Sequence, residues 1–300
     1  MGRKKGDNIN GWLVIDKSEG LGSTQVVNQT RYLYNAKKNG HAGTLDPFAS
    51  GVLPIAFGEA TKLIPYVMQG EKEYEFILKF GVETDTLDLS GKVVDVTDVI
   101  PTKEQILEVL PLFKGEIIQV PPIYSAIKIN GERAYDLARK GETADIKERK
   151  IYIYELELCE ILPDNQARFR VKCSKGTYVR TLGADIAKKL GSRGHLTMLR
   201  RTKCGIFDLN GAILLENLKK MDYSEQTQLL KPLLTCLCDI TVIALSDGDA
   251  DRLRKGQRLS KAVYGIEYSD REAVAVFDNQ PVAVVRIEEK SISPIRVFNL

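Results

Sequence analysis

The sequence is short of histidine and of paired cysteines, which argues against a structural zinc site. Only His41 and His195 occur in the 300 residues, and no two cysteines are separated by exactly two residues. Zinc sites usually draw four ligands from such closely spaced cysteines and histidines. The number of cysteines is also odd, which predicts mostly buried thiols in a reducing cytosol. The five are Cys159, Cys173, Cys204, Cys236 and Cys238. The last two could form a redox pair, but we expect them on one face of a short strand.

Long hydrophobic runs and nucleotide-binding signatures are missing as well. The apolar run near the N-terminus extends only from Trp12 to Ile15, too short for a signal peptide. Position 6 is Gly6, so the myristoylation pattern fails. No segment approaches the length of a membrane span, and neither a Walker sequence nor GxGxxG occurs. We therefore expect a cytoplasmic protein with no membrane association.

The composition that is present is that of a globular protein with a substantial core. Apolar residues make up 43% and charged residues 28%, and 300 residues suit one large domain or two ordinary ones. The net charge is only +3, so the placement of charge matters more than its sum. Surface solvation explains any one basic cluster, but three with interleaved tyrosines favour a nucleic-acid surface. The clusters are Lys188, Lys189 and Arg193; Arg200, Arg201 and Lys203; and Arg252, Arg254, Lys255 and Arg258.

Hydrophobic periodicity predicts an α+β chain. Short apolar or alternating segments predict strands at residues 11–17, 52–57, 74–80, 151–158, 167–173 and 195–201. Helices are expected after a cap at Ser23 or Thr24, at residues 61–68 with Met68 facing the core, after a Thr102–Gln105 capping box, and after a cap at Thr177.

A change of texture near Asp239 predicts a domain boundary. We expect residues 1–238 to form the larger domain and residues 239–300 a small, mostly β domain. Within the first, residues from about 120 to 150 are broken by prolines and carry an Asn130-Gly131 turn. A basic helix with Arg133, Arg139 and Lys140 follows, so this segment is typical of an exposed, RNA-binding excursion.

The segment GHAGTLDPFASG contains a single carboxylate, Asp46. Pro47 disfavours helical backbone for the residue before it, and the neighbouring glycines disfavour regular structure. A carboxylate on such a loop could be a nucleophile, a general base or a magnesium ligand. It could equally accept hydrogen bonds within its own turn. Magnesium is the weakest of these readings, since the next acidic motif, Thr84–Asp88, lies far along the chain.

Arg180 lies at the start of a predicted helix, after the segment CSKGTYV. It could simply pack along the surface. Lys175, Gly176 and Tyr178 nevertheless form a basic, aromatic and glycine-containing entry to that helix. Such an entry favours binding of a phosphate or a carboxylate.

Six segments, in order, resemble the motif set of the bacterial tRNA pseudouridine synthase B, or TruB, family, over about residues 9–215. They are NGWLVIDKSEGLGST, GHAGTLDPFASGVLPIAFGEATK, KEYEFILKFGVETDTLD, QVPPIYSAIKINGERAYDLARKGE, CSKGTYVRTLGADIAKKLG and LTMLRRTKCGIF. The resemblance implies isomerisation of uridine-55 in the T-loop of tRNA. It also implies the pseudouridine synthase fold, a mixed, mostly antiparallel sheet flanked by helices. The C-terminal segment resembles the small β domain called PUA.

The resemblance also assigns catalytic roles. It implies that Asp46 is the nucleophile, attacking either C6 of the base or C1′ of the sugar of a flipped-out nucleotide. Arg180 would form a salt bridge that keeps this carboxylate ionised and oriented. Tyr74 would contact the flipped base and is a candidate for removing the C5 proton.

Further residues would bind substrate. By the same resemblance, Leu199 packs on the base, Lys17 supports the region of Tyr74, and His41 helps to hold the RNA loop open. Tyr178, beside Arg180, is added to this set. Many relatives have Asp-Lys-Pro where this chain has Asp16-Lys17-Ser18, so the turn after Lys17 is freer. No metal or organic cofactor is implied.

Two other functions stay open at this point. The chain could act as a tRNA-folding chaperone, with its chemistry secondary, or as a guide-RNA-dependent relative within a ribonucleoprotein particle. Such relatives tend to have Lys-rich tails, and this sequence ends at Leu300 without one. We therefore expect a monomer that binds the T-arm of tRNA and needs no protein partner.

Overall fold

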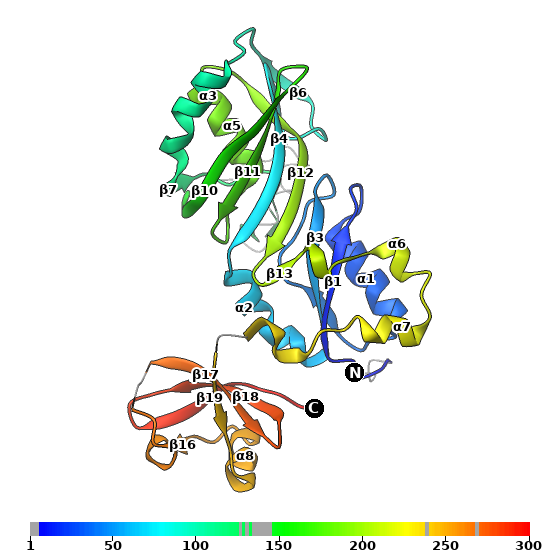
Figure 1. The fold of residues 1–300 in the computed structure, drawn as a ribbon, viewed down its shortest axis with the longest axis vertical. Coiled ribbons are helices and arrows are strands. Elements are labelled where there is room, and N and C mark those ends of the chain that lie inside the picture. Colours follow the sequence, from blue (N-terminus) through cyan, green and yellow to red (C-terminus); the bar gives the residue numbers. More distant parts are fainter. Residues whose placement is uncertain (1–5, 126–127, 130–131, 134–145, 238–239, 268–269) are drawn as a thin grey trace.

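The computed structural model describes residues 6–125, 128–129, 132–133, 146–237, 240–267 and 270–300. Its main feature is a ten-stranded mixed sheet that runs through the upper two thirds of the molecule (Figure 1). In spatial order the strands are β14 (Ile213–Leu214), β1 (Gly11–Lys17), β3 (Ser50–Phe57), β12 (Gly194–Cys204), β4 (Lys72–Phe80), β11 (Gln166–Cys173), β10 (Arg149–Leu162) and β7 (Gly115–Gln119). Two short strands complete it, β2 (Asn39–His41) on β3 and β13 (Phe207–Asp208) on β12. Only β1–β14 and β3–β12 pair in parallel, so the expected mostly antiparallel sheet is confirmed.

Strand β1 is buried on both faces, which explains its uninterrupted apolar run. Leu13 and Ile15 pack into one core cluster, whereas Trp12 and Val14 pack into a second cluster on the opposite face. Alternate residues of a strand point to opposite faces, so both sets must be apolar when both faces are covered.

The half of the sheet around β4 supplies the framework of the site. Phe76, Leu78 and Phe80 share one buried face of β4, as their alternation predicts. Strands β11 and β12 pair with β4 on either side. The expected turn between β10 and β11 is present, with Asp164 and Asn165 at φ of 57° and 60°. This left-handed pair suits a tight hairpin.

The helices lie close to their predicted positions, but two of their predicted caps are wrong. They are α1 (Ser23–Leu33), α2 (Ile64–Gln69), α3 (Lys103–Val109), α5 (Val179–Lys189), α6 (Leu215–Leu218), α7 (Tyr223–Gln228) and α8 (Asp247–Arg254). The capping box of Thr102 and Gln105 is confirmed. Helix α1 begins instead after Gly22, and α5 after Tyr178, so the caps predicted at Ser23 or Thr24 and at Thr177 are wrong. The predicted helix at 61–68 is divided into a 3₁₀ turn, Gly58–Leu63, and α2. Pro65 at the start of α2 accounts for that division. Met68 is 46% exposed, contrary to its predicted core position.

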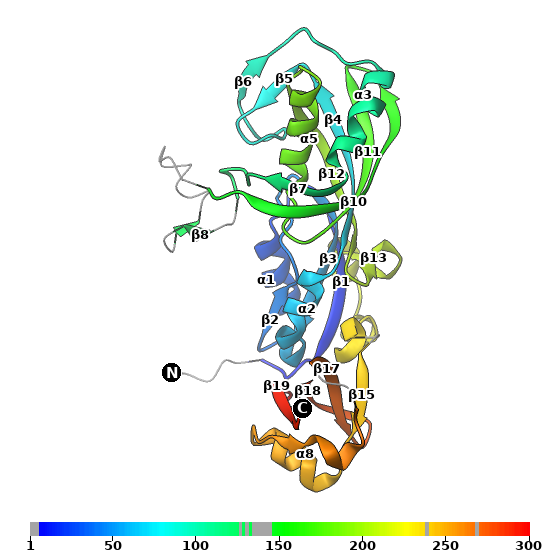
Figure 2. The same ribbon diagram turned by 90° about the vertical axis from the view of Figure 1, so that its left-hand side faces the viewer.

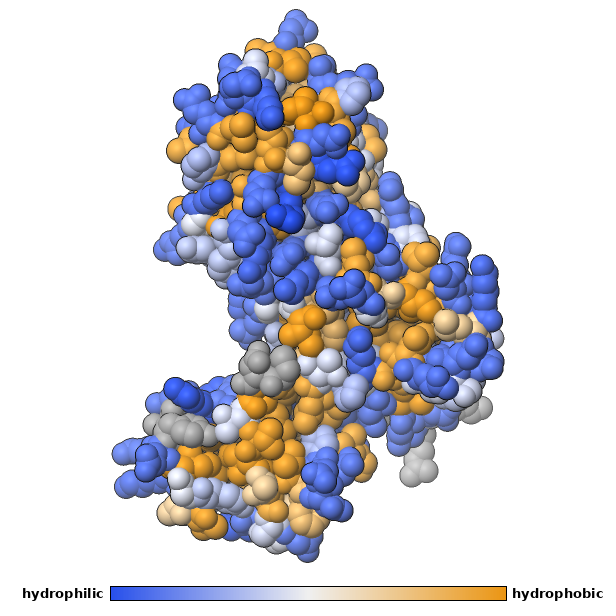
Figure 3. Space-filling view, in the orientation of Figure 1, coloured by the Kyte–Doolittle hydropathy of each residue, from blue (hydrophilic) through white to orange (hydrophobic). Residues whose placement is uncertain are grey.

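A separate five-stranded sheet forms the lower part of the molecule (Figure 1). Its order is β15 (Thr241–Ala244), β17 (Arg271–Phe277), β18 (Gln280–Ile287), β19 (Ser291–Val297) and β16 (Leu259–Ser260). Val274, Val284 and Phe298 belong to the same apolar cluster as Trp12 and Leu63 of the main body. Figure 3 shows hydrophobic residues gathered where this sheet meets the body. The C-terminal sheet is thus held by a core that it shares with the rest of the chain.

Two further predictions concern the cysteines at 236 and 238 and the excursion at about residues 120–150. The strand expected at Cys236 and Cys238 is wrong, because residues Leu233–Leu237 form a 3₁₀ turn, and Cys238 lies outside the described residues. Of the expected excursion, the structure describes a hairpin of β8 (Lys128–Ile129) and β9 (Glu132–Arg133), and β8 lies out to one side of the body (Figure 2). The predicted turn at Asn130-Gly131 lies outside the described residues. A third hairpin pairs β5 (Val82–Thr84) with β6 (Val93–Val96). No helix among the described ranges is long and apolar enough to cross a membrane.

Candidate active site

The loop that presents Asp46 joins β2 to β3 and is tethered from three directions. The Ser23 hydroxyl at the start of α1 donates to the carbonyl of Leu45 at 2.7 Å and accepts from its amide at 2.8 Å. Arg201 of β12 donates to the carbonyl of Gly43 at 3.0 Å. Within the loop, the amide of Ala49 donates to the carbonyl of Asp46 at 3.0 Å. These bonds hold the backbone while the side chain of Asp46 stays 39% exposed.

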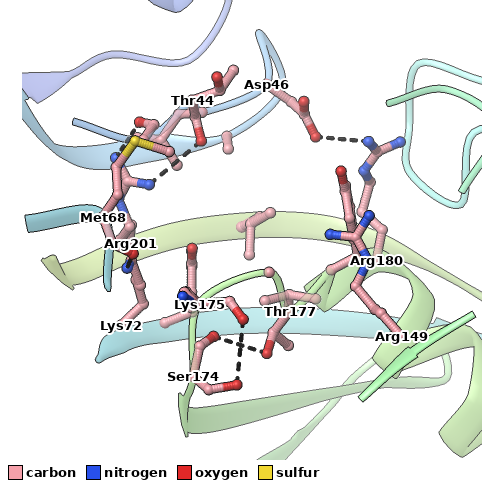
Figure 4. A pocket seen from close by; sticks show the side chains of 18 of the residues that line it. Thr44, Asp46, Met68, Lys72, Arg149, Ser174, Lys175, Thr177, Arg180 and Arg201 are labelled. Carbon is pink, nitrogen blue, oxygen red and sulfur yellow. Dashed lines mark hydrogen bonds and ion pairs between the residues drawn. The ribbon is translucent and has the colours of Figure 1, made fainter. Parts of the chain in front are cut away.

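The carboxylate of Asp46 forms an ion pair with Arg180, at 2.8 Å (Figure 4). Arg180 lies in the first turn of α5, and its side chain is only 5% exposed. It also donates to the carbonyls of Thr86 and Tyr124, at 2.7 and 2.8 Å, and lies 3.4 Å from the buried carboxylate of Asp88. A guanidinium held by so many acceptors has little freedom to rotate, so it fixes the direction of Asp46.

Gln119, the last residue of β7, holds the backbone of Tyr178, the residue that precedes α5. Its side chain accepts from the amide of Tyr178 at 2.8 Å and donates to the carbonyl of the same residue at 3.1 Å. Thr177 instead donates its hydroxyl to the carbonyl of Ser174. Gln119 therefore anchors the backbone that leads into α5, and Thr177 does not cap this helix.

A cleft of about 870 Å³ opens beside the ion pair of Asp46 and Arg180. Tyr74, Tyr178 and Leu199 all line it, so the structure brings five of the predicted site residues together. The remaining walls come from the Asp46 loop, α2, β4, β12 and the segments that lead into β10 and α5. Their residues are Gly43, Thr44, Leu45, Ala49, Pro65, Met68, Gln69, Lys72, residues 147–150, residues 174–177, Val179 and Arg201. This space is large enough for a flipped nucleotide.

Two tyrosines of the cleft are held in the neutral form. Burial raises the pKa of Tyr74 far above its usual value, and Arg201 opposes that shift only partly. Burial also raises the pKa of Tyr178, with a further contribution from Asp46. The guanidinium of Arg149 lies 5.6 Å from the centre of the Tyr178 ring. Both phenols therefore keep their protons near neutral pH.

His41 and Lys17 do not line this cleft. His41 lies on β2, and its Nδ1 is buried without a hydrogen-bond partner among the described residues. Burial and the charge of Arg201 lower the pKa of His41, so its ring is neutral. Lys17 is fully buried and donates to the carbonyls of Ser18, Leu21 and Pro47, at 3.0, 2.6 and 3.4 Å. The bond to Pro47 joins Lys17 to the Asp46 loop, and the other two hold the turn that follows β1.

Sequence reasoning missed the roles of Asp88, Gln119 and Arg201. Asp88 belongs to the acidic motif that was considered only for magnesium, and it lies instead against Arg180. In the part of the chain that the structure describes, no group of histidines, cysteines and acids could hold a metal ion. Arg201 was assigned to a surface cluster but is 2% exposed. Its place in an alternating strand was the one available signal that it could point inward.

The predicted RNA-binding residues are only partly described. The backbone of Arg133 belongs to strand β9, so its predicted place in a basic helix is wrong. Arg139 and Lys140 lie outside the described residues. In and after α8, Arg252, Arg254, Lys255 and Arg258 are exposed, as a phosphate-binding surface requires. Arg252 pairs with Asp249 and Arg254 with Asp251, both at 3.2 Å, so part of that positive charge is balanced.

Comparison with known proteins gives a consistent result over the whole chain. The model of the TruB family pseudouridylate synthase N-terminal domain matches residues 31–179, and that of the tRNA pseudouridylate synthase B C-terminal domain matches residues 180–238. The chain is 42% identical to tRNA pseudouridine synthase B of Caulobacter vibrioides, over 99% of both chains. It is 46% identical to the protein of that name from Zymomonas mobilis, over 98% of this chain and 97% of the relative.

Solved structures share the fold. A Cbf5-Nop10-Gar1 complex contains a chain that matches with a TM-score of 0.72 and 25% identity, over 96% of this chain and 84% of that one. The archaeal box H/ACA sRNP Nop10-Cbf5 complex matches with a TM-score of 0.71 and 23% identity, over 97% and 86%.

Proposed function

The chain belongs to the TruB family of pseudouridylate synthases, and from that premise we propose that it isomerises uridine-55 in the T-loop of tRNA to pseudouridine. The observation that carries this proposal is the half-exposed carboxylate of Asp46, held 2.8 Å from a buried arginine at the edge of a cleft. Its near relatives are named as tRNA pseudouridine synthases, which supports tRNA as the substrate.

In the proposed reaction, Asp46 is the nucleophile. The target nucleotide leaves the RNA stack and enters the cleft, where Leu199 and Tyr74 pack on the base. The carboxylate adds to C6 of the uracil or to C1′ of the ribose. The bond between N1 and C1′ then breaks, a bond between C5 and C1′ forms, and the bond to Asp46 breaks, which returns the free carboxylate. The C5 proton is lost while N1 gains one. Atoms and electrons balance within the nucleotide, so the isomerisation consumes no co-reactant.

Arg180 and Tyr74 have different tasks in this reaction. Arg180 pairs with Asp46 and directs it into the cleft, and Asp88 holds Arg180 from behind. Tyr74 could remove the C5 proton only after losing its own, and its raised pKa opposes that loss in the free protein. We therefore assign Tyr74 first to packing on the base, with proton removal as a second task that a pH profile of the rate can test.

Other parts of the proposal concern the domains of the protein, its partners and its location. We propose that residues 239–300 form a PUA-like RNA-binding domain beside a catalytic domain of residues 1–238. The chain would act as a monomer in the cytoplasm, without an obligate protein partner. His41, on β2 beside the Asp46 loop of the protein, would contact the RNA and help to hold the T-loop of the tRNA open.

The decisive experiment compares Asp46→Asn with Asp164→Asn. Asp164 is an exposed residue of the β10–β11 turn, and asparagine tolerates its left-handed backbone. Tritium release from C5 of uridine in an unmodified T-arm stem-loop measures the reaction. We expect no turnover by Asp46→Asn, with binding retained, and normal turnover by Asp164→Asn. Turnover by Asp46→Asn above background would contradict the proposed nucleophile.

A further inference from the structure

The end of the cleft away from the ion pair of Asp46 and Arg180 is positively charged and buried. Figure 4 shows Lys72 and Arg201 together on one side of the cleft, with Lys175 beside them and Asp46 on the other side. Lys72 is 6% exposed and Arg201 is 2% exposed, and both line the cleft. No carboxylate among the described residues lies within 4.0 Å of either charge. Two buried cations therefore share this end of the cleft without an acidic partner.

The contacts of Lys72 leave one donor free. Lys72 lies on β4, two residues before Tyr74 and on the same face, between Cys173 of β11 and Cys204 of β12. Its ammonium donates to the carbonyls of Met68 and Gly70. An ammonium has three N–H groups, so a third remains for a group in the cleft.

A buried cation without a counterion carries a desolvation cost. Burial lowers the pKa of Lys72, and the neighbouring charges of Arg201 and Lys175 lower it further. Arg201 is better satisfied, because it donates to the carbonyls of Val52, Thr44 and Gly43. An anion in the cleft would relieve the cost at Lys72.

The adjoining wall is suited to an anion. Because Cys173 pairs with Lys72, the loop of residues 174–177 starts beside this lysine and leads into α5. Lys175 and Gly176 of this loop are exposed, and Gly176 has a φ of +82°. The loop therefore places an exposed lysine at the mouth of the cleft, above the buried Lys72.

We propose that Lys72 and Lys175 form a phosphate subsite, which binds a backbone phosphate next to the nucleotide that enters the cleft. This inference rests on the proposed function, because the phosphate belongs to the same RNA. The subsite would fix the sugar–phosphate backbone at one end of the cleft while the base reaches Asp46 at the other. A charge-assisted hydrogen bond of this kind contributes to positioning as well as to affinity.

The test combines protein variants with neutral phosphates. A set of T-arm stem-loops is prepared in which each RNA carries one methylphosphonate. The modified linkage is either the one directly before or the one directly after the target uridine. Wild type should lose roughly 10- to 100-fold in kcat/KM at one linkage, the size expected when a charged hydrogen bond is removed. Lys72→Met should show a similar loss with normal RNA and little further loss with that methylphosphonate. Lys175→Met should show the same coupling at the same linkage, and its exposed position removes the risk of misfolding.

The matched control is Lys203→Met, on the neighbouring strand β12. Lys203 pairs with Glu73, is 41% exposed and does not line the cleft, so its effect should simply add to that of any methylphosphonate. Losses that add at every linkage for both Lys72→Met and Lys175→Met would overturn the subsite, and would leave Lys72 a structural tie between β4 and the residues after α2. The coupling between each lysine variant and each methylphosphonate can also be measured as Kd in the Asp46→Asn background, where no reaction occurs. A failure of the proposed reaction would therefore be distinguished from a failure of the proposed subsite.

Discussion

Arg180 connects two carboxylates, that of Asp46 in the cleft and that of the buried Asp88. Arg180→Met would leave the buried Asp88 with hydrogen bonds from Thr86 and Ser90 but without an opposite charge. Loss of one member of a buried ion pair typically costs about 3–5 kcal/mol of unfolding free energy. Arg180→Met would also free Asp46, so we expect the isomerisation rate to fall at least about 100-fold. Arg180→Lys keeps the charge but not the fork of donors, and should lie between Arg180→Met and wild type. Urea unfolding and single-turnover rates measure the two effects.

A second substitution separates stability from catalysis. Adding Asp88→Asn to Arg180→Met removes the unpaired buried charge, so stability should recover in part while the rate stays low. If both single Arg180 variants kept near-normal rates at saturating RNA, the ion pair would have no catalytic importance.

Lys17 gives the protein a pH-dependent stability. Burial lowers the pKa of Lys17 from 10.5 to about 8, although Asp46 and Glu19 oppose the shift. Between these two values the unfolded chain binds the proton more tightly than the folded protein does. The contribution of Lys17 to stability therefore rises with pH from about 8 to 10.5, and is constant below that window. The urea midpoint of wild type is compared with that of Lys17→Met at each pH. The difference, wild type minus variant, should rise across this window, and a constant difference would contradict a lowered pKa for Lys17.

At the scale of elements, the junction of the Asp46 loop with β3 depends on Gly51. Its φ is +103°, and a Cβ there would lie 2.1 Å from the carbonyl oxygen of Arg201 on β12. This close approach is the parallel pairing of β3 with β12, which also sets the position of the Arg201 side chain. A side chain at Gly51 would therefore force the two strands apart.

Gly20 provides the matched comparison for Gly51. Its φ is +85°, and a Cβ there would meet nothing within 4 Å. Gly20→Ala should cost only the left-handed strain of about 1–2 kcal/mol, whereas Gly51→Ala should cost at least about 4 kcal/mol. Chemical denaturation measures both, and equal losses would show that β3 and β12 adjust without difficulty.

At the scale of the whole molecule, the C-terminal sheet and the main body are joined by more than a linker. Besides the shared apolar cluster, Tyr66 donates to Glu272 at 2.7 Å and Lys62 donates to the carbonyl of Val297 at 2.7 Å. Deleting residues 239–300 would expose Trp12 and Leu63. Exposed charges, not truncation, are therefore the suitable means to test RNA contacts of this sheet.

Lys255 and Arg258 are the better candidates for those contacts. Arg252 and Arg254 have acidic partners at 3.2 Å, whereas Arg258 is 70% exposed and its acidic partner, Glu288, lies farther away, at 3.8 Å. Changing Lys255 and Arg258 together to glutamine should reduce the log–log salt slope of binding to whole tRNA by roughly 0.7–0.9 for each phosphate that the protein no longer neutralises. The rate on a minimal stem-loop should not change. Glutamine at the exposed Lys219 and Lys220 is the control. An unchanged slope for whole tRNA would remove these two residues from the RNA surface.

Local patterns in the sequence determined the strands and helices and the motifs of the family. The run from Gly11 to Lys17, the alternation from Tyr74 to Phe80 and the capping box of Thr102 are all properties of neighbouring residues, so they could be predicted. The segments around Asp46 and Arg180 were also recognisable, but only through the family resemblance, since the residue types alone also fitted a turn acid and a surface arginine.

Tertiary structure alone decided which partners these residues have. Asp88 and Arg180 are 92 positions apart, and Gln119 holds the backbone of Tyr178, 59 residues away. No local pattern encodes such contacts, so Thr177 was the wrong cap and Arg201 was taken for a surface residue. Lys17 was assigned to Tyr74, but the fold brings the carbonyls of Ser18, Leu21 and Pro47 around its ammonium. Burial is a property of the assembled sheet, and it alone turned Lys72 and Arg201 into charges that face a cleft.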